Sequence, residues 1–181
     1  MFPQSLKFMN PVLQKWYGIL AHDRKELCNS LEGISQSQFT TRPPSGKWSI
    51  SEIVSHLITA DRLSLDYMKK KSQGAETLHD AGWFEEVKMM FFILSQRAPI
   101  KYNAPRGLVE KMPGEINLSN LKNEWNTLLL DYQNFLEKIP DQHLRKKIYK
   151  HPILGRMDAK LCLQSIHEHY HHHLPQIKRL L

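Results

Sequence analysis

Five of the ten histidines of this chain stand in one stretch, SIHEHYHHHLPQIKRLL, at residues 165–181. Four of them form two pairs with a spacing of four residues, His167 with His171 and His169 with His173. Side chains four residues apart in an α-helix lie one turn apart on one face, so both imidazoles of a pair can reach a single ion. Imidazole nitrogen is a ligand for zinc, nickel and other first-row metals. The stretch therefore offers two candidate ligand pairs, but two ligands do not make a metal site, and an inward histidine can also be a hydrogen-bonded core residue.

The two pairs lie differently relative to the apolar face of the predicted helix. At about 100° per residue, one stripe collects the apolar side chains Ile166, Tyr170 and Ile177. His169 and His173 fall on one edge of this stripe, inside the apolar sector, which favours them as ligands. His167 and His171 fall at its outer margin, and His172 points nearly opposite, towards solvent. The pattern leaves open whether His167 or His171 joins the coordination.

The residues from His167 to His171 also spell H-E-x-x-H, in which zinc proteases use the glutamate as a general base. This pair lies off the apolar stripe, and Glu168 points away from the stripe, so we expect Glu168 to be solvated. An expression tag is disfavoured because Glu168 and Tyr170 interrupt the run and an amphipathic segment follows it. A solvated helix face remains the alternative for the outer histidines.

A catalytic zinc-type site usually has three protein ligands and one open position. The candidate for the third ligand is His56, in GKWSISEIVSHLITAD, the only histidine of the helix that we predict from Ile50. It lies at the flank of that helix's apolar face, where a ligand can point between helices; the alternative is an ordinary surface histidine. A water or thiol in the open position would be the reactive group, since a bound metal lowers its pKa. The sequence identifies no catalytic side chain.

Four long segments with helical periodicity must position these residues. The first covers residues 10–31. The second begins at Ile50, because Ser49 and Glu52 form an S-x-x-E capping box. The third has apolar residues at steps of three and four over 118–139, and Pro140 is expected to end it. The fourth begins after Asp158, a suitable N-cap.

The connections between these segments are less regular. Residues 73–117 contain a short apolar helix over 85–96 and then a link rich in proline and glycine, APIKYNAPRGLVEKMPGE. We expect a turn over residues 151–158, and Pro175 predicts a bend or local break in the last helix. Amphipathic helices bury their stripes against one another, so we predict an all-α, four-helix bundle with a long connection between the second and third long helices. Residues 1–181 are expected to form a single domain.

Charge and composition indicate which kinds of binding partner are not expected. The net charge is +7, but the basic residues are spread out and no nucleic-acid motif accompanies them, so nucleic-acid binding is not expected. No run approaches 18 apolar residues, so we expect no membrane span, and the first residues do not resemble a signal peptide. Cys28 and Cys162 are the only cysteines and suggest no disulfide framework. A reducing cytoplasm is the simplest compartment.

Two motifs resemble a known family. GKWSISEIVSHL matches a W-S-x-x-E-x-x-x-H-L helix start, and the last helix carries H-x-x-x-H-x-x-Q-I. In this order and spacing they resemble the DinB/YfiT-like superfamily. The resemblance implies a divalent metal, often nickel or zinc, bound by His56, His169 and His173, and homodimers are common in such families. Some members resemble transferases or isomerases that use a low-molecular-weight thiol such as bacillithiol or mycothiol.

Three functions remain open from the sequence. The first is a metal-dependent transferase or hydrolase of small molecules, with or without a thiol co-substrate, in which Cys28 and Cys162 are structural and Asp61 pairs with an arginine or lysine. The second is a non-catalytic metal-binding or stress-response protein of the same fold. The third is a helical scaffold without metal. The extra histidines around the ligand pair also allow alternative coordination.

Overall fold

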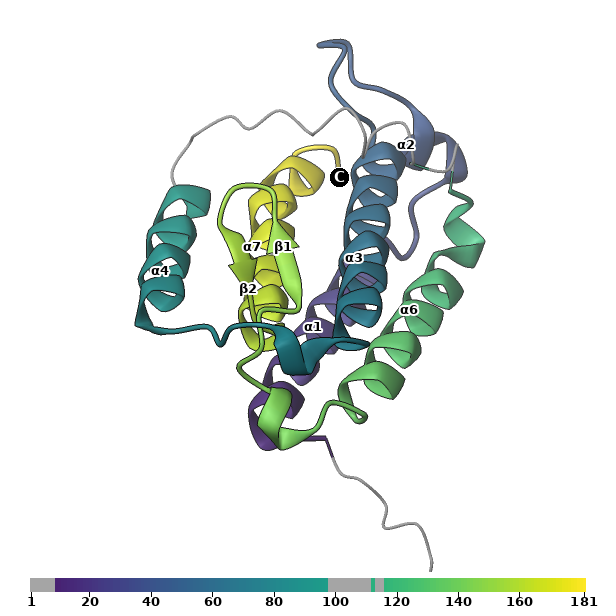
Figure 1. Cartoon of the computed structure of the whole chain (residues 1–181). Helices are drawn as coiled ribbons and strands as arrows, with labels where there is room; N and C mark the ends of the chain where they lie inside the picture. The colour runs from purple at the N-terminus through teal and green to yellow at the C-terminus, as the bar shows by residue number, and fades with distance from the viewer. Residues whose placement is uncertain (1–8, 98–111, 113–115) are drawn as a thin grey trace, which may run out of the picture.

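Four long α-helices form the body of the protein. The computed structural model describes residues 9–97, 112 and 116–181, and most of the predicted link 98–115 lies outside them. The long helices are α1 (Pro11–Ser30), α3 (Ile50–Ser72), α6 (Leu121–Leu136) and α7 (Ala159–Lys178). They confirm the predicted four-helix bundle (Figure 1). Among the described residues, no helix combines the length and apolar character needed to cross a membrane.

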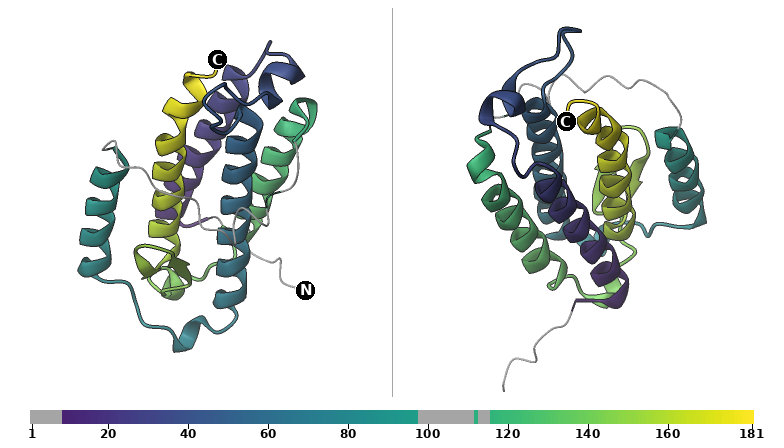
Figure 2. Two further views of the ribbon diagram at one scale, coloured as in Figure 1. Left: turned by 90° about the horizontal axis from the view of Figure 1, so that it is seen from above. Right: turned by 180° about the vertical axis from the view of Figure 1, so that it is seen from behind.

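The bundle does not follow a simple up-and-down path. Helix α7 packs on α1 and α3, and α6 packs on the same two helices from the other side. Helices α1 and α7 run in one direction, and α3 and α6 run in the opposite one (Figures 1 and 2). The chain must therefore return from the end of α3 to the start of α6, which the long connection allows. This connection carries α4 (Trp83–Arg97), which packs on α7 outside the bundle.

Short elements join and flank the helices. They are α2 (Gln36–Thr40), the 3-10 helices η1 (Ala75–Thr77), η2 (Leu118–Asn120) and η3 (Asp141–His143), and the strands β1 (Tyr149–His151) and β2 (Gly155–Met157). The two strands form an antiparallel hairpin where the sequence predicted only a turn. Three-residue strands are too short to show alternating hydrophobicity. The Nδ1 atom of His151 accepts the main-chain N–H groups of Ile153 and Leu154, each at 3.2 Å, and Gly155 supplies the positive φ of 78° at the turn.

Helix starts agree with the sequence better than helix ends. The capping box of Ser49 and Glu52 is present at α3, and Asp158 caps α7 by accepting the N–H of Leu161 at 2.9 Å. Helix α6, however, ends at Leu136 rather than just before Pro140, because the chain tightens into i→i+3 bonds there. We expected a bend or a local break at Pro175, and a break is absent, since α7 continues to Lys178. Pro175 is exposed, so water can reach the carbonyl that lacks a main-chain donor.

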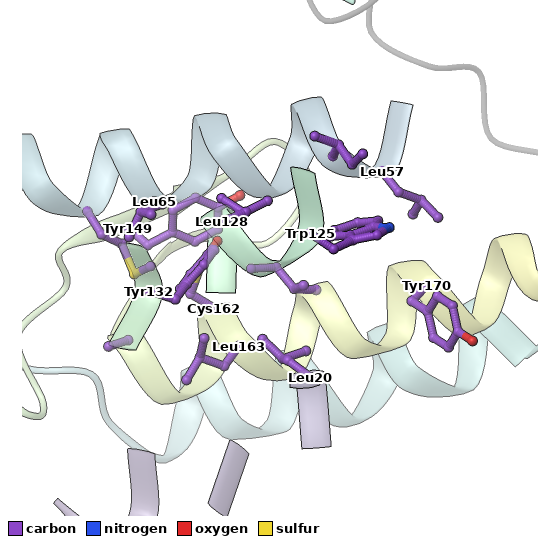
Figure 3. Close-up of a cluster of buried hydrophobic side chains, with 14 of the residues drawn as sticks. Leu20, Leu57, Leu65, Trp125, Leu128, Tyr132, Tyr149, Cys162, Leu163 and Tyr170 are labelled. Carbon is purple, nitrogen blue, oxygen red and sulfur yellow. The ribbon is translucent and has the colours of Figure 1, made fainter. Parts of the chain in front are cut away.

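The apolar stripes of the four helices meet in one core, part of which Figure 3 shows. Its largest fully buried side chains include Trp125 and Tyr132 of α6 and, unusually, the charged Arg24 of α1. The Arg24 Nη2 atom donates to Asp61 Oδ2 of α3 at 2.6 Å, which confirms the pairing expected for Asp61. The guanidinium also lies 5.0 Å from the Trp125 ring and 5.2 Å from the Tyr170 ring. Cys28 and Cys162 are buried free thiols, as expected for structural cysteines.

Candidate metal centre

The packing of α7 against α3 brings the three predicted ligands together. Because the two helices run in opposite directions, the first half of α3 faces the second half of α7. His56 Nε2 lies 3.0 Å from His169 Nε2, and His173 Nε2 lies 3.2 Å from the same atom. The centroids of the three rings are 4.8–4.9 Å apart. His56 and His173 are buried, and His169 is half-buried.

The three nitrogen atoms cannot all be satisfied by hydrogen bonds to one another. An imidazole Nε2 atom carries either one N–H bond or one lone pair. His169 Nε2 therefore makes at most one linear hydrogen bond, although two other Nε2 atoms lie within hydrogen-bond distance of it. With metal–nitrogen bonds of about 2.0–2.1 Å, three imidazole ligands place their nitrogens roughly 3.0–3.4 Å apart. The residues present thus fit a divalent metal ion bound by three lone pairs.

The environment also keeps these imidazoles neutral, as metal ligands must be. Burial first, and then the nearby charge of His172, lower the pKa of His56 to about 4. Burial and the charge of His56 lower the pKa of His173 to about 3. For His169, burial followed by the neighbouring imidazoles His173 and His56 moves the pKa well below its usual value. All three therefore offer lone pairs near neutral pH.

Two side chains hold the imidazoles in place. His173 Nδ1 lies 3.3 Å from Gln176 Oε1, one turn along α7. A proton on Nδ1 donated to this amide oxygen leaves the Nε2 lone pair directed into the site. The indole of Trp48, just before the cap of α3, packs on the His56 ring with centroids 5.2 Å apart. In the sequence Gln176 was recognised only as part of a motif, with no role of its own. The contact between Trp48 and His56 could not be inferred from the sequence.

The face of α7 that bears Glu168 and His172 was predicted wrongly. Glu168 is buried rather than solvated, and its Oε1 atom accepts a hydrogen bond from Arg97 Nη2 of α4 at 3.2 Å. His172 is half-buried rather than directed to solvent, and its Nδ1 atom lies 3.4 Å from the Gln96 carbonyl oxygen. Both corrections have one cause, because α4 covers this side of α7. His172 also contacts the site, with its ring centroid 5.2 Å from that of His173.

His167 and His171 belong to a separate group. They face Asp23 of α1, and these three residues form a second set of side chains with metal-ligand spacing. His167 is half-buried and His171 is exposed, in agreement with their predicted place at the margin of the apolar stripe. The H-E-x-x-H string therefore spans two environments, because its glutamate points to α4 and its histidines point to α1.

Comparison with known proteins identifies the family. The sequence model of the DinB superfamily matches residues 19–177 of the chain, which contain all three clustered histidines. The chain belongs to the DinB superfamily. This DinB chain is also 22% identical over 157 residues to the uncharacterized protein YuaE of Bacillus subtilis (strain 168), a match that covers 87% of this chain and 91% of that protein.

A solved structure supports the fold of this DinB chain. It is described as "YfiT from Bacillus subtilis is a probable metal-dependent hydrolase with an unusual four-helix bundle topology". The two folds superpose with a TM-score of 0.58, at 17% sequence identity, over 99% of this chain and 91% of that one. The likeness extends over nearly the whole chain and supports the four-helix-bundle fold.

Proposed function

We propose that this DinB chain is an enzyme that uses a divalent metal ion, nickel or zinc, to act on small molecules. His56, His169 and His173 would hold the ion. The observation that carries the proposal is the convergence of three Nε2 atoms that hydrogen bonds alone cannot satisfy. The description of YfiT as a metal-dependent hydrolase supports the same class of reaction. We place the enzyme in the cytoplasm, where the buried thiols of Cys28 and Cys162 stay reduced.

Three neutral imidazoles leave coordination positions open for a substrate or co-substrate. When bound, the ion would act as a Lewis acid and lower the pKa of a water or thiol ligand. With water the reaction would be a hydrolysis, and with a low-molecular-weight thiol it would be a group transfer. The chain needs no nucleophilic cysteine for either reaction, and burial raises the pKa of both of its cysteine thiols.

The side chains around the site have separate tasks in this proposal. Gln176 and Trp48 hold two of the ligand imidazoles in orientation. His172 stands beside His173 and is half-buried, so it would be available to exchange protons with a substrate bound at the ion. Arg97, which pairs with Glu168 on the same side of α7 as His172, is largely exposed and offers a guanidinium for an anionic substrate group.

Metal analysis of the purified protein tests the ligand set. The protein should be prepared without nickel chromatography, and its metal content measured by mass spectrometry. We expect His56→Ala and His173→Ala each to lose one equivalent of metal, with the helical circular dichroism retained. His22→Gln, at an exposed histidine of α1, is the matched control and should lose none. If the wild-type protein holds no stoichiometric metal after incubation with nickel or zinc, the chain is a helical scaffold and the proposal is wrong.

An activity screen then separates an enzyme from a metal-binding protein without catalysis. The metal-loaded protein should be tested for hydrolysis of small esters and amides, and for transfer of thiols to electrophiles. Activity that disappears in His173→Ala supports the enzyme. Metal binding without activity on any substrate would favour the alternative, a non-catalytic stress-response protein of the same fold.

A further inference from the structure

The interface of α1 and α7 carries a second group of potential ligands. His167 Nδ1 lies 2.7 Å from Asp23 Oδ2, and His171 Nε2 lies 3.6 Å from Asp23 Oδ1. The centroids of the two imidazoles are 4.4 Å apart. One atom from each of the three side chains lies within 4.8 Å of the others. None of these residues belongs to the three-histidine site.

The charges around Asp23 call for a cation. Asp23 is only 6% exposed, and its nearest guanidinium, Arg24 Nη1, is 3.9 Å away. The other end of that guanidinium is bound to the buried Asp61 at 2.6 Å. One arginine thus faces two buried carboxylates, which leaves a negative charge that a cation between Asp23 and the histidines would balance. Asp23 has His167 as its close hydrogen-bond partner but shares its arginine with Asp61, and a buried carboxylate with an incomplete counter-charge is costly, which favours a cation at this group.

Access to the group is open on one side. The His171 side chain is 43% exposed and the His167 side chain 20% exposed, whereas Asp23 lies beneath them. An ion could therefore enter from solvent, bind the carboxylate at the base of the group and keep water ligands at its outer positions. Two imidazoles and one carboxylate suit zinc, nickel or cobalt better than calcium or magnesium, which prefer oxygen ligands.

We propose that Asp23, His167 and His171 form a second metal site, specific for a divalent first-row transition-metal ion. In neutral His167 the single ring proton moves from Nδ1 to Nε2 as the ion takes its place beside Asp23, so the number of bound protons does not change. The ligands His167 and His171 alternate along α7 with His169 and His173. The helix thus serves two centres, one against α3 and one against α1. This inference does not depend on the proposed enzyme activity.

A zinc titration of the full chain tests the second site. By calorimetry on metal-free protein, we expect two equivalents of zinc in the wild type. The double variant His56→Ala/His173→Ala should keep one. His171→Gln should weaken that remaining equivalent by at least about tenfold, because it removes a ligand. Since His171 is exposed, this variant is expected to fold normally. His22→Gln, one residue before Asp23, is the control and should leave both equivalents unchanged.

The outcomes separate this site from the three-histidine site. One equivalent in the wild type that disappears in His56→Ala/His173→Ala but survives His171→Gln would overturn the second site and leave the first intact. A second equivalent that survives both His171→Gln and Asp23→Asn would show adventitious surface binding and also overturn it. If the double variant does not fold, the difference between wild type and His171→Gln decides the question alone. Cobalt, whose visible absorption reports its ligands, provides an independent measurement on the same variants.

Discussion

Replacement of Gln176 by leucine should weaken metal binding without removing a ligand. The Gln176 Oε1 atom lies 3.3 Å from His173 Nδ1, and this contact selects the tautomer in which Nε2 is free to bind the ion. Leucine has nearly the same size but cannot accept the proton, so His173 can rotate or change tautomer. Loss of such an outer partner typically weakens metal affinity about 10- to 100-fold.

The magnitude can be followed through thermal stability. At a free metal concentration about 100 times the dissociation constant, binding stabilises the folded protein by about 2.7 kcal/mol. A 10- to 100-fold weaker affinity would reduce this stabilisation to about 1.4 to 0.4 kcal/mol at the same metal concentration. For a chain of this size each kcal/mol shifts the melting temperature by about 2–4 °C. The metal-induced increase in Tm should therefore fall from about 5–11 °C to about 1–6 °C.

The assay compares Tm with and without nickel or zinc, so that any effect of the substitution on the metal-free fold cancels. Gln176→Glu is the matched control, because a carboxylate still accepts the Nδ1 proton and should keep the full metal-induced shift. Equal shifts in Gln176→Leu and the wild type would refute the role that we give to this side chain. His173→Ala sets the lower limit, because it removes the ligand itself.

Three further predictions concern the fold. Arg24→Met should lower the free energy of unfolding by about 3–5 kcal/mol because it leaves the buried Asp61 carboxylate without its ion-pair partner. Asp61→Leu should cost less, because Arg24 keeps Asp23 at 3.9 Å, and the double variant should lose less than the sum of the two, as measured in urea. Burial lowers the pKa of His151 to about 4. Between about pH 6.5 and 4, His151 therefore binds a proton in the unfolded chain but not in the folded protein. His151 should therefore contribute up to about 3 kcal/mol of destabilisation as the pH falls through this window and none above it. His151→Asn keeps an acceptor for the turn. Its Tm should fall less than the Tm of the wild type as the pH is lowered. Ser49→Ala should cost about 0.5–2 kcal/mol through the lost cap of α3, seen as a lower urea midpoint with an unchanged slope.

The homodimer expected from the family resemblance stays a prediction. Light scattering on the purified chain distinguishes the monomer mass of 21.3 kDa from twice that value. The partner in the reaction, a small molecule with or without a thiol, likewise rests on the activity screen described above.

The helical periodicity of the sequence was sufficient to find the bundle and the inward histidines. The apolar stripe of α7 placed His169 and His173 correctly, because a helix of this length has one main buried face. The capping box located the start of α3 and so fixed where His56 lies along it. Periodicity could not show that His56 lies next to His169 and His173, because that contact depends on the direction in which α3 and α7 pack.

The wrong predictions concern side chains of α7 that another helix covers. A helical wheel treats each helix in isolation and contains no information about such a neighbour. A helical wheel assigns Glu168 and His172 to solvent because it contains no information about α4. The apolar pattern of α4 indicates a helix but not its docking place, which is the side of α7 opposite the bundle core. Asp23 was missed for a related reason. A carboxylate on the flank of α1 becomes a candidate ligand only once α7 lies beside it.

The position of α7 among its neighbours explains why one histidine-rich helix has several chemical environments. Helix α7 contacts α3, α1 and α4, and its residues turn towards them in succession. His169 and His173 meet His56 of α3, whereas His167 and His171 meet the buried carboxylate of α1. Adjacent substitutions in this run should therefore have unrelated effects, because a change of one position rotates the side chain by about 100° towards a different helix. By the same reasoning, substitutions four residues apart should resemble each other, so His169→Gln should reproduce the metal loss of His173→Ala, and His167→Gln should reproduce that of His171→Gln.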